Sequence, residues 1–221
     1  MPAPSSDLAA PVTRGRTLDH AAAVYDILAP VMTLGQEGRY RRLALRLLDL
    51  RGGEKVLDVG CGTGVLTRLL AARLNAADAC AVGLDAAPKM IDVARRRAAG
   101  LPRLRFDVGV AETLPYGDAS FDCAVSTFFF HHIDAELKRR SLAELRRVLK
   151  PAGKLIIVDV DTPTTWFGKL CAWSGYWLFK QEEIRENIRG ELPRALADVP
   201  FREVTRIAHY SGYVTVFQAV K

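Results

Sequence analysis

The run Val56-Leu-Asp-Val-Gly-Cys-Gly-Thr-Gly64 constrains the fold of this chain more than any other segment. Its apolar start predicts a buried strand over Lys55–Val59, and its glycines allow a tight turn and a close approach of a ligand to the backbone. The helix expected next, Val65–Leu74, begins with amides that favour an anionic group. A dinucleotide-binding G-x-G-x-x-G turn needs a glycine at Val65, and a P-loop needs Gly-Lys-Ser/Thr. The run therefore predicts a ligand-binding strand–turn–helix unit of neither kind.

Strand and helix patterns alternate after this turn. Short apolar runs separated by helical patterns predict βαβ units, a mainly parallel sheet and helices on both of its faces. A turn at Ser211-Gly212 joins the last two strands and predicts an antiparallel C-terminal hairpin. We therefore expect an α/β, Rossmann-like fold with a seven-stranded sheet. The expected strands are Lys55–Val59, Cys80–Leu84, Leu104–Val108, Phe121–Thr127, Lys154–Val160, Val204–Tyr210 and Tyr213–Val220, and the expected helices are Arg39–Leu50, Val65–Leu74, Pro88–Ala98 and Glu136–Leu149.

The length of 221 residues fits one domain of this class. We expect a disordered tail over residues 1–15 and a single domain over 16–221, in which 16–50 form a helical lid and 162–200 a cap. The N-terminus lacks the basic start and long apolar core of a signal peptide. Four scattered cysteines support neither a metal site nor a disulfide framework, so we expect a reducing, cytoplasmic location.

Polar residues fall at the ends of the predicted strands, where an open α/β sheet binds its ligands. Asp58 lies just before the glycines, where a carboxylate suits a cationic group. Asp85 ends the second strand, 21 residues after Gly64, where a carboxylate can accept ribose hydroxyls. The loop Val110–Pro115 follows the third strand and is placed to wall a base. The segment Ser126–His132 follows the fourth strand.

Together these residues resemble class I S-adenosylmethionine (SAM)-dependent methyltransferases, in particular the subgroup of ubiquinone/menaquinone biosynthesis methyltransferases. The resemblance covers Tyr25 to Gly153 and extends more weakly over Glu-Asn-Ile-Arg-Gly-Glu-Leu-Pro193 and the final hairpin. It implies SAM as cofactor and S-adenosylhomocysteine (SAH) as product. The residues that it implies for cofactor binding are Tyr25, Asp58, Gly60, Cys61, Gly62, Thr63, Gly64, Asp85, Ala86, Met90, Ala111, Glu112 and Ser126.

The resemblance also assigns parts of the cofactor to these residues. Asp58 and the glycines would line the methionine and ribose portions, Asp85 would hold the ribose, and Met90, Ala111 and Glu112 would border the adenine. Tyr25 would cover the cofactor, and Ser126 would lie near its methionine end. Two positions depart from the family pattern: Val110 stands where relatives carry an aspartate, and Ala152 where they carry a glycine.

Methyl transfer to a phenol, or to a ring carbon that a phenol activates, benefits from a general base. The candidates are His20, near the expected lid, and His131 and His132, after the fourth strand. A structural role for the His131–His132 pair is the alternative. Phe128-Phe-Phe130 would form either an apolar wall beside the acceptor or ordinary core.

Residues 162–180 contain every tryptophan of the chain. A helix opened by Pro163 would place Trp166, Leu170, Trp173 and Trp177 on one stripe. Three interpretations compete: a cap packed on the domain, an interfacial helix that contacts a membrane surface, and a homodimer contact. Tryptophan beside lysine suits the lipid headgroup boundary, which favours an apolar acceptor.

The leading hypothesis is a SAM-dependent methyltransferase (EC 2.1.1.-) for a small hydrophobic or lipid-like acceptor, such as a quinone precursor or a lipid headgroup. One alternative is a soluble natural-product O- or N-methyltransferase. A second, of another class, is a non-catalytic SAM-binding regulatory protein. The net charge of +6 is modest, and no basic tract is interleaved with aromatic residues, which argues against a nucleic-acid partner.

Overall fold

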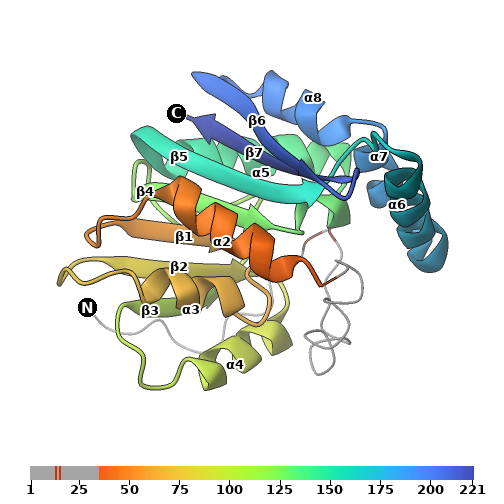
Figure 1. Ribbon diagram of the computed structural model, residues 1–221. Coiled ribbons are helices and arrows are strands. Elements are labelled where there is room, and N and C mark those ends of the chain that lie inside the picture. The colour runs from red at the N-terminus through yellow and green to blue at the C-terminus, as the bar shows by residue number, and fades with distance from the viewer. Residues whose placement is uncertain (1–12, 14, 16–34) are drawn as a thin grey trace.

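The computed structural model describes residues 13, 15 and 35–221. A seven-stranded sheet in the order β3-β2-β1-β4-β5-β7-β6 forms its centre (Figure 1). Strands β1 to β5 pair in parallel, and β7 runs antiparallel to both β5 and β6, which confirms the expected fold class. The strands are β1 (Lys55–Val59), β2 (Cys80–Asp85), β3 (Leu104–Val108), β4 (Phe121–Thr127), β5 (Leu149–Val160), β6 (Glu203–Tyr210) and β7 (Val214–Val220).

Helices cover both faces of the sheet (Figure 1). On one face, helices α2 and α3 pack against alternate strand residues such as Val56, and on the other, α5 and α8 pack against their neighbours, such as Leu57. This alternation follows from the two-residue period of a strand, and each fully buried aliphatic side chain stabilises the fold by roughly 1.5–3 kcal/mol. The helices are α2 (Glu37–Leu48), α3 (Val65–Ala71), α4 (Pro88–Arg97), the 3-10 turn η2 (Phe130–His132), α5 (Ala135–Val148), α6 (Trp166–Phe179), α7 (Glu182–Ile188) and α8 (Glu191–Asp198).

Several predicted bounds shift by a few residues. Strand β5 begins at Leu149 instead of Lys154, because the Ala152 amide bonds the Lys221 carbonyl and keeps this segment in the sheet. The expected start of a helix at Pro163 is wrong. Helix α6 begins at Trp166, where the Thr165 hydroxyl accepts a hydrogen bond from the Gly168 amide and caps the first turn.

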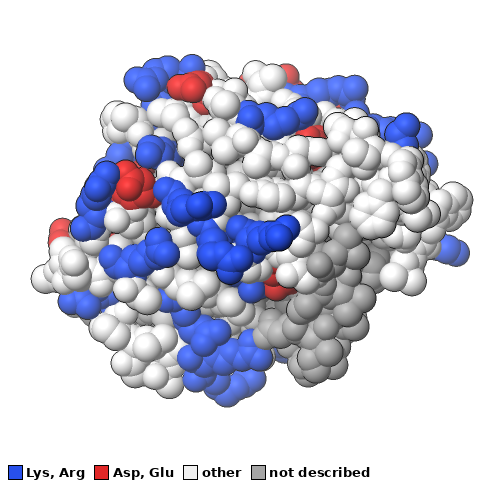
Figure 2. Space-filling model, in the orientation of Figure 1, with Lys and Arg blue, Asp and Glu red and all other residues white. Residues whose placement is uncertain are grey.

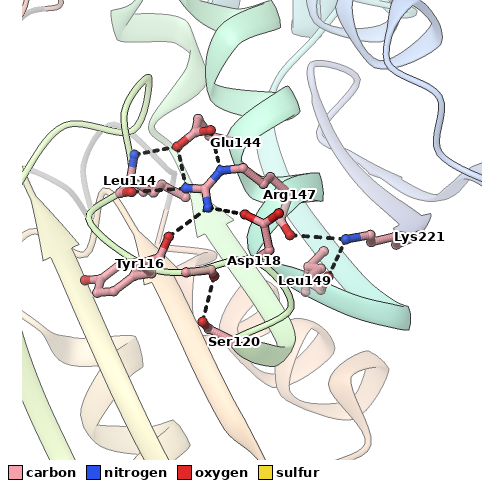
Figure 3. Close-up of polar contacts among 9 residues, drawn as sticks. Leu114, Tyr116, Asp118, Ser120, Glu144, Arg147, Leu149 and Lys221 are labelled. Carbon is pink, nitrogen blue, oxygen red and sulfur yellow. Dashed lines mark hydrogen bonds and ion pairs between the residues drawn. The ribbon is translucent and has the colours of Figure 1, made fainter.

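A cluster of polar groups around Arg147 fixes the loop between β3 and β4. The Arg147 guanidinium donates to both carboxylate oxygens of Glu144 and to the carbonyls of Leu114 and Tyr116 (Figure 3). The Leu114 amide donates in turn to Glu144, and Arg147 also pairs with Asp118. Because charge-assisted bonds of this kind are about twice as strong as neutral ones, the cluster ties the loop firmly to α5.

Candidate cofactor and acceptor site

The glycine turn, residues 60–64, lies at the carboxyl end of β1, next to the end of β2. The amides of Gly60 and Cys61 both donate to the Leu84 carbonyl, at 2.8 and 3.1 Å. Gly60 has φ +72°, and a β-carbon there would lie 2.7 Å from Cβ of Phe129. The turn therefore requires glycine on both conformational and steric grounds.

Two cavities open on either side of this turn and share Gly60, Gly62 and Phe128. We name the larger one the main cleft; its volume is about 650 Å³, and it is open to solvent. The smaller, the side cavity, encloses about 540 Å³. The main cleft is lined by Thr13, Gly15, Val59, Gly60, Gly62, Leu84, Asp85, Ala86, Met90, Gly109, Val110, Ala111, Glu112, Phe128, Phe129, His132 and Ile133, and the side cavity by Glu37, Tyr40, Arg41, Gly60, Cys61, Gly62, Thr63, Val65, Leu66, Thr127 and Phe128.

Most residues predicted to bind the cofactor line one of these cavities. The main cleft contains Gly60, Gly62, Asp85, Ala86, Met90, Ala111 and Glu112, and the side cavity adds Cys61 and Thr63. Three others, Asp58, Gly64 and Ser126, line neither cavity. Tyr25 and His20 lie outside the described residues, so their roles stay predictions.

Gly64 and Ser126 support the floor of the site. Gly64 has φ +74°, and a β-carbon there would lie 2.5 Å from Cζ of Phe106, so this glycine lets α3 approach β3. The buried Ser126 hydroxyl donates to the Val59 carbonyl at 2.9 Å and fixes β4 against β1. Their positions assign them packing roles directly beneath the turn.

Asp58 is a buried carboxyl under the glycine turn. The Thr67 hydroxyl donates to its Oδ2 at 2.7 Å, whereas its Oδ1 has no hydrogen-bond partner within the described part of the chain. Burial raises the pKa of Asp58 to about 7; the Asp85 charge adds to this shift, and Thr67 and Arg41 oppose it. A buried carboxyl with an unpaired oxygen is the group that a ligand cation would satisfy.

Asp85 and Glu112 lie at the rim of the main cleft. The Gly62 and Ala87 amides each donate to one carboxylate oxygen of Asp85, at 2.9 Å. These bonds orient the carboxylate in the main cleft, and a carboxylate there is an acceptor that suits ribose hydroxyls. Glu112 Oε1 accepts from the Thr13 hydroxyl at 2.6 Å, so Thr13 contacts the loop predicted to border the adenine.

The two adjacent histidines lie in different environments. His132 lines the main cleft, and its Nδ1 lies 3.3 Å from Oε1 of Gln181. His131 is buried, and its Nδ1 lies 2.7 Å from Oδ1 of Asp159. The imidazole centroids are 4.0 Å apart. The His132 side chain therefore lines the cleft, whereas the His131 side chain lies in the interior of the protein.

Asp159 is a site residue that the sequence reasoning missed. Its Oδ2 accepts from the Phe130 amide at 2.7 Å, and its Oδ1 contacts His131, so one buried carboxylate holds the whole η2 turn. A signal existed in the sequence: Asp159 interrupts an otherwise apolar strand, and a buried charge of this kind is seldom kept without partners.

The three consecutive phenylalanines divide between the two roles expected for them. Phe128 and Phe129 line the main cleft, whereas Phe130 is fully buried in the core. With Ile133, the first two form an apolar wall that has His132 as its polar group.

The four residues predicted to form one stripe on α6 differ in their exposure to solvent. Trp166, Leu170 and Trp177 are exposed by 78, 60 and 68 %, whereas Trp173 is half-buried against Tyr176. Phe167 and Leu178 extend the exposed apolar face. None of the helices in residues 35–221 has the length and apolar character needed to cross a bilayer.

Comparison with known proteins gives consistent matches. The family model described as a methyltransferase domain matches residues 56–153, which contain the glycine turn, Asp85 and the wall of the main cleft. The "Ubiquinone/menaquinone biosynthesis C-methyltransferase UbiE" of Citrifermentans bemidjiense is 36% identical over 217 residues, covering 89% of this chain and 91% of that protein. The "Demethylmenaquinone methyltransferase" of Symbiobacterium thermophilum is 36% identical, covering 89% of this chain and 82% of that one. The crystal structure of a SAM-dependent methyltransferase from Methanosarcina mazei aligns with a TM-score of 0.59 at 25% identity, covering 78% of this chain and 94% of that one.

Proposed function

Because the chain belongs to the class I SAM-dependent methyltransferases, we propose that it methylates a ring carbon of a hydroxylated, quinone-related aromatic acceptor with an apolar tail. The observation that carries this proposal is the wall of the main cleft, where Phe128, Phe129 and Ile133 line the same space as the imidazole of His132. Such a wall suits a flat apolar ring with one polar substituent. The names of two relatives, one a C-methyltransferase of quinone biosynthesis, support the same acceptor class.

The residues present fit SAM. Glycines leave the backbone of the turn open to close approach by a ligand, and the Asp85 carboxylate lines the main cleft. Within the described residues, Oδ1 of the buried Asp58 has no hydrogen-bond partner. When bound, SAM supplies an electrophilic methyl group on a sulfonium sulfur. The chain orients the acceptor and excludes water through the apolar wall, and orientation of this kind can contribute roughly 7–11 kcal/mol to barrier reduction.

His132 is the proposed general base. Since Gln181 Oε1 can only accept, Nδ1 of His132 carries the proton in their contact, and Nε2 of the neutral ring is then the acceptor. Nε2 would take the proton of the acceptor hydroxyl, which raises the electron density of the ring carbon to be methylated. The hydrogen that this carbon carries would leave as a proton once the carbon is methylated, and its loss restores the aromatic ring. The buried His131–Asp159 pair keeps the η2 turn in place and so positions His132.

We propose that the exposed face of α6 contacts an anionic lipid surface from which the apolar acceptor reaches the cleft. Exposed Lys169 and Lys180 lie beside this apolar face, which suits a headgroup boundary. Figure 2 shows a largely uncharged surface where α6 lies, with basic side chains around it. Gln181 follows the end of α6 and contacts His132, so the C-terminal end of this helix lies next to the main cleft.

The direct test is transfer of labelled methyl from SAM to a prenylated hydroquinone that lacks one ring methyl group. We expect one added methyl, which mass spectrometry of the product places on a ring carbon, and stoichiometric SAH. Polar catechols and amines without a tail should react at least roughly tenfold more slowly, since they bury less apolar area. Turnover of polar acceptors alone would contradict the proposal and favour a natural-product O- or N-methyltransferase.

The variant His132→Ala tests the base in the same assay. General-base catalysis contributes about 10²–10⁴-fold, so we expect kcat to fall within that range while SAH affinity stays within about twofold. Unchanged kcat on the hydroquinone would remove His132 from the proposal without affecting the acceptor class.

A further inference from the structure

Lys138 is a fully buried lysine next to the wall of the main cleft. It belongs to the N-terminal part of α5, and its ammonium group donates to the Ile133 carbonyl and, at 3.1 Å, to Oε2 of Glu186 on α7. Ile133 follows the η2 turn and lines the main cleft. A single ammonium group therefore joins the end of the η2 turn, and with it the cleft wall, to α7.

The surroundings of Lys138 are acidic. Burial lowers the pKa of its ammonium group, whereas the bond to Glu186 and the negative charges of Glu186, Asp159 and Glu191 oppose this shift. Because desolvation offsets much of the attraction within a buried ion pair, such a pair is weak evidence for a gain in stability. The groups that Lys138 joins are therefore the better guide to its role.

Helix α7 begins next to the residue that orients His132. Gln181 is the N-cap of this helix, and its Oε1 lies 3.3 Å from Nδ1 of His132. Glu186 lies further along the same helix, so its bond to Lys138 fixes α7, and with it Gln181, relative to α5. The bond to the Ile133 carbonyl fixes the end of the η2 turn, which contains His132, to the same ammonium group. Lys138 thus sets the spacing between His132 and Gln181.

The η2 turn is held near both of its ends. At its start, Asp159 of β5 accepts a hydrogen bond from the Phe130 amide at 2.7 Å. Just after its end, the Ile133 carbonyl accepts from Lys138, which also reaches α7. Loss of the second anchor should therefore loosen the turn from α7 while the start of the turn stays in place.

We propose that Lys138 is a positioning residue for the proposed base: through the Ile133 carbonyl and Glu186 it holds the η2 turn against α7, so that Gln181 keeps His132 in its Nδ1-protonated form. Nε2 of His132 is then the proton acceptor. This inference rests on the role of His132 in the proposed function. Its consequence for the imidazole can be measured in the ligand-free protein, independently of any acceptor.

The tautomer of His132 is the direct readout. In protein labelled with nitrogen-15 at histidine, NMR couplings between ring nitrogens and ring protons show which nitrogen carries the proton when the ring is neutral. We expect the Nδ1-protonated form in the parent protein, because the hydrogen bond of one ring nitrogen sets the tautomer. Lys138→Met keeps an unbranched side chain without the charge, and it should shift the tautomer ratio about threefold or more toward the Nε2-protonated form.

Activity gives a second readout. Lys138→Met should lower kcat on the prenylated hydroquinone about tenfold or more, since a misplaced general base loses part of its contribution. SAH affinity should not change, because Lys138 lines neither cavity. Glu186→Ala should shift the tautomer and kcat in the same direction, whereas Glu186→Gln keeps an acceptor for Lys138 and should stay close to the parent. Arg140→Met is the matched control, since it removes an exposed cation of the same helix, 3.8 Å from Glu136.

Two results would overturn the inference. One is a parent tautomer ratio in both Lys138→Met and Glu186→Ala, and the other is a lower melting temperature of Lys138→Met with unchanged tautomer and kcat, which would leave Lys138 a stabilising role alone. Should Lys138→Met fail to fold, Glu186→Ala decides, because the Glu186 side chain is 35 % exposed. A tautomer shift with unchanged kcat would support the positioning by Lys138 and count only against His132 as the base.

Discussion

Asp58 shows how strongly one side chain depends on its surroundings. Its burial beneath the glycine turn raises its pKa to about 7, with Asp85 adding to the shift and Thr67 and Arg41 opposing it. In the ligand-free protein the carboxyl is therefore largely neutral below pH 7. A bound ammonium group favours the ionised carboxylate, so ligand binding and proton release are coupled.

We predict that SAH affinity rises about tenfold between pH 6 and pH 8 and levels off above pH 7. The sign follows from the raised pKa: at pH 6 binding must displace a proton from Asp58, and at pH 8 the carboxylate is already ionised. Calorimetry in buffers of different ionisation enthalpy should detect proton release at pH 6. Asp58→Asn should bind more weakly with a flat profile, and a flat profile in the parent protein would refute the coupling.

Residues marked by a local pattern were predictable from the sequence. The glycine turn, Asp85 and His132 all follow strand ends and come together as the rule for open α/β sheets requires. The position of Arg41 at the side cavity was not predicted, because Arg41 differs from its neighbour Arg42 only in helical phase, which places it on the side of the buried Leu45. The division of labour between His131 and His132 was equally hidden, since it depends on Asp159 and Gln181 from other elements.

Helix α6 is the element whose surface is least explained by the domain alone. Its period predicted a single stripe, but the structure turns Trp173 inward and leaves Trp166, Leu170 and Trp177 outward. Packing against the rest of the domain, through the buried Ala172, sets this rotation and cannot be derived from periodicity. The start at Trp166 likewise depends on the Thr165 cap.

We predict that the protein co-sediments with vesicles that contain anionic lipid and binds neutral vesicles more weakly. The double variant Trp166→Ser/Trp177→Ser should lose roughly tenfold or more in vesicle affinity, because two large apolar side chains no longer enter the interface. Leu101→Ser is the matched control, since Leu101 is an exposed apolar residue outside α6, 48 % accessible, and its loss should have no effect.

Two outcomes would contradict the lipid contact. One is a parent protein that stays in the supernatant at low salt with anionic vesicles, and the other is a double variant that binds as well as the parent. A dimer that forms without vesicles and dissociates in the double variant would instead assign the face to a second copy of the chain.

At the scale of the whole molecule, the sheet order places the site. The chain runs outward from β1 in both directions, to β2 and β3 and to β4 and β5, so a crevice forms where β1 and β4 are neighbours. Alternating strand and helix patterns were sufficient to predict a mainly parallel sheet with helices on both faces and a C-terminal hairpin, whereas the order of the strands was not among the predictions. The shapes of the two cavities were not predictable, because they arise where α2, the glycine turn and the η2 turn meet after packing.

A crystal structure of the protein with SAH would show directly where the cofactor lies relative to the apolar wall of the main cleft. We expect one SAH molecule across the main cleft and the side cavity, with its ribose beside Asp85 and its sulfur facing the wall of Phe128, Phe129 and His132. An SAH molecule outside these cavities, or one whose sulfur faces away from that wall, would contradict this expectation.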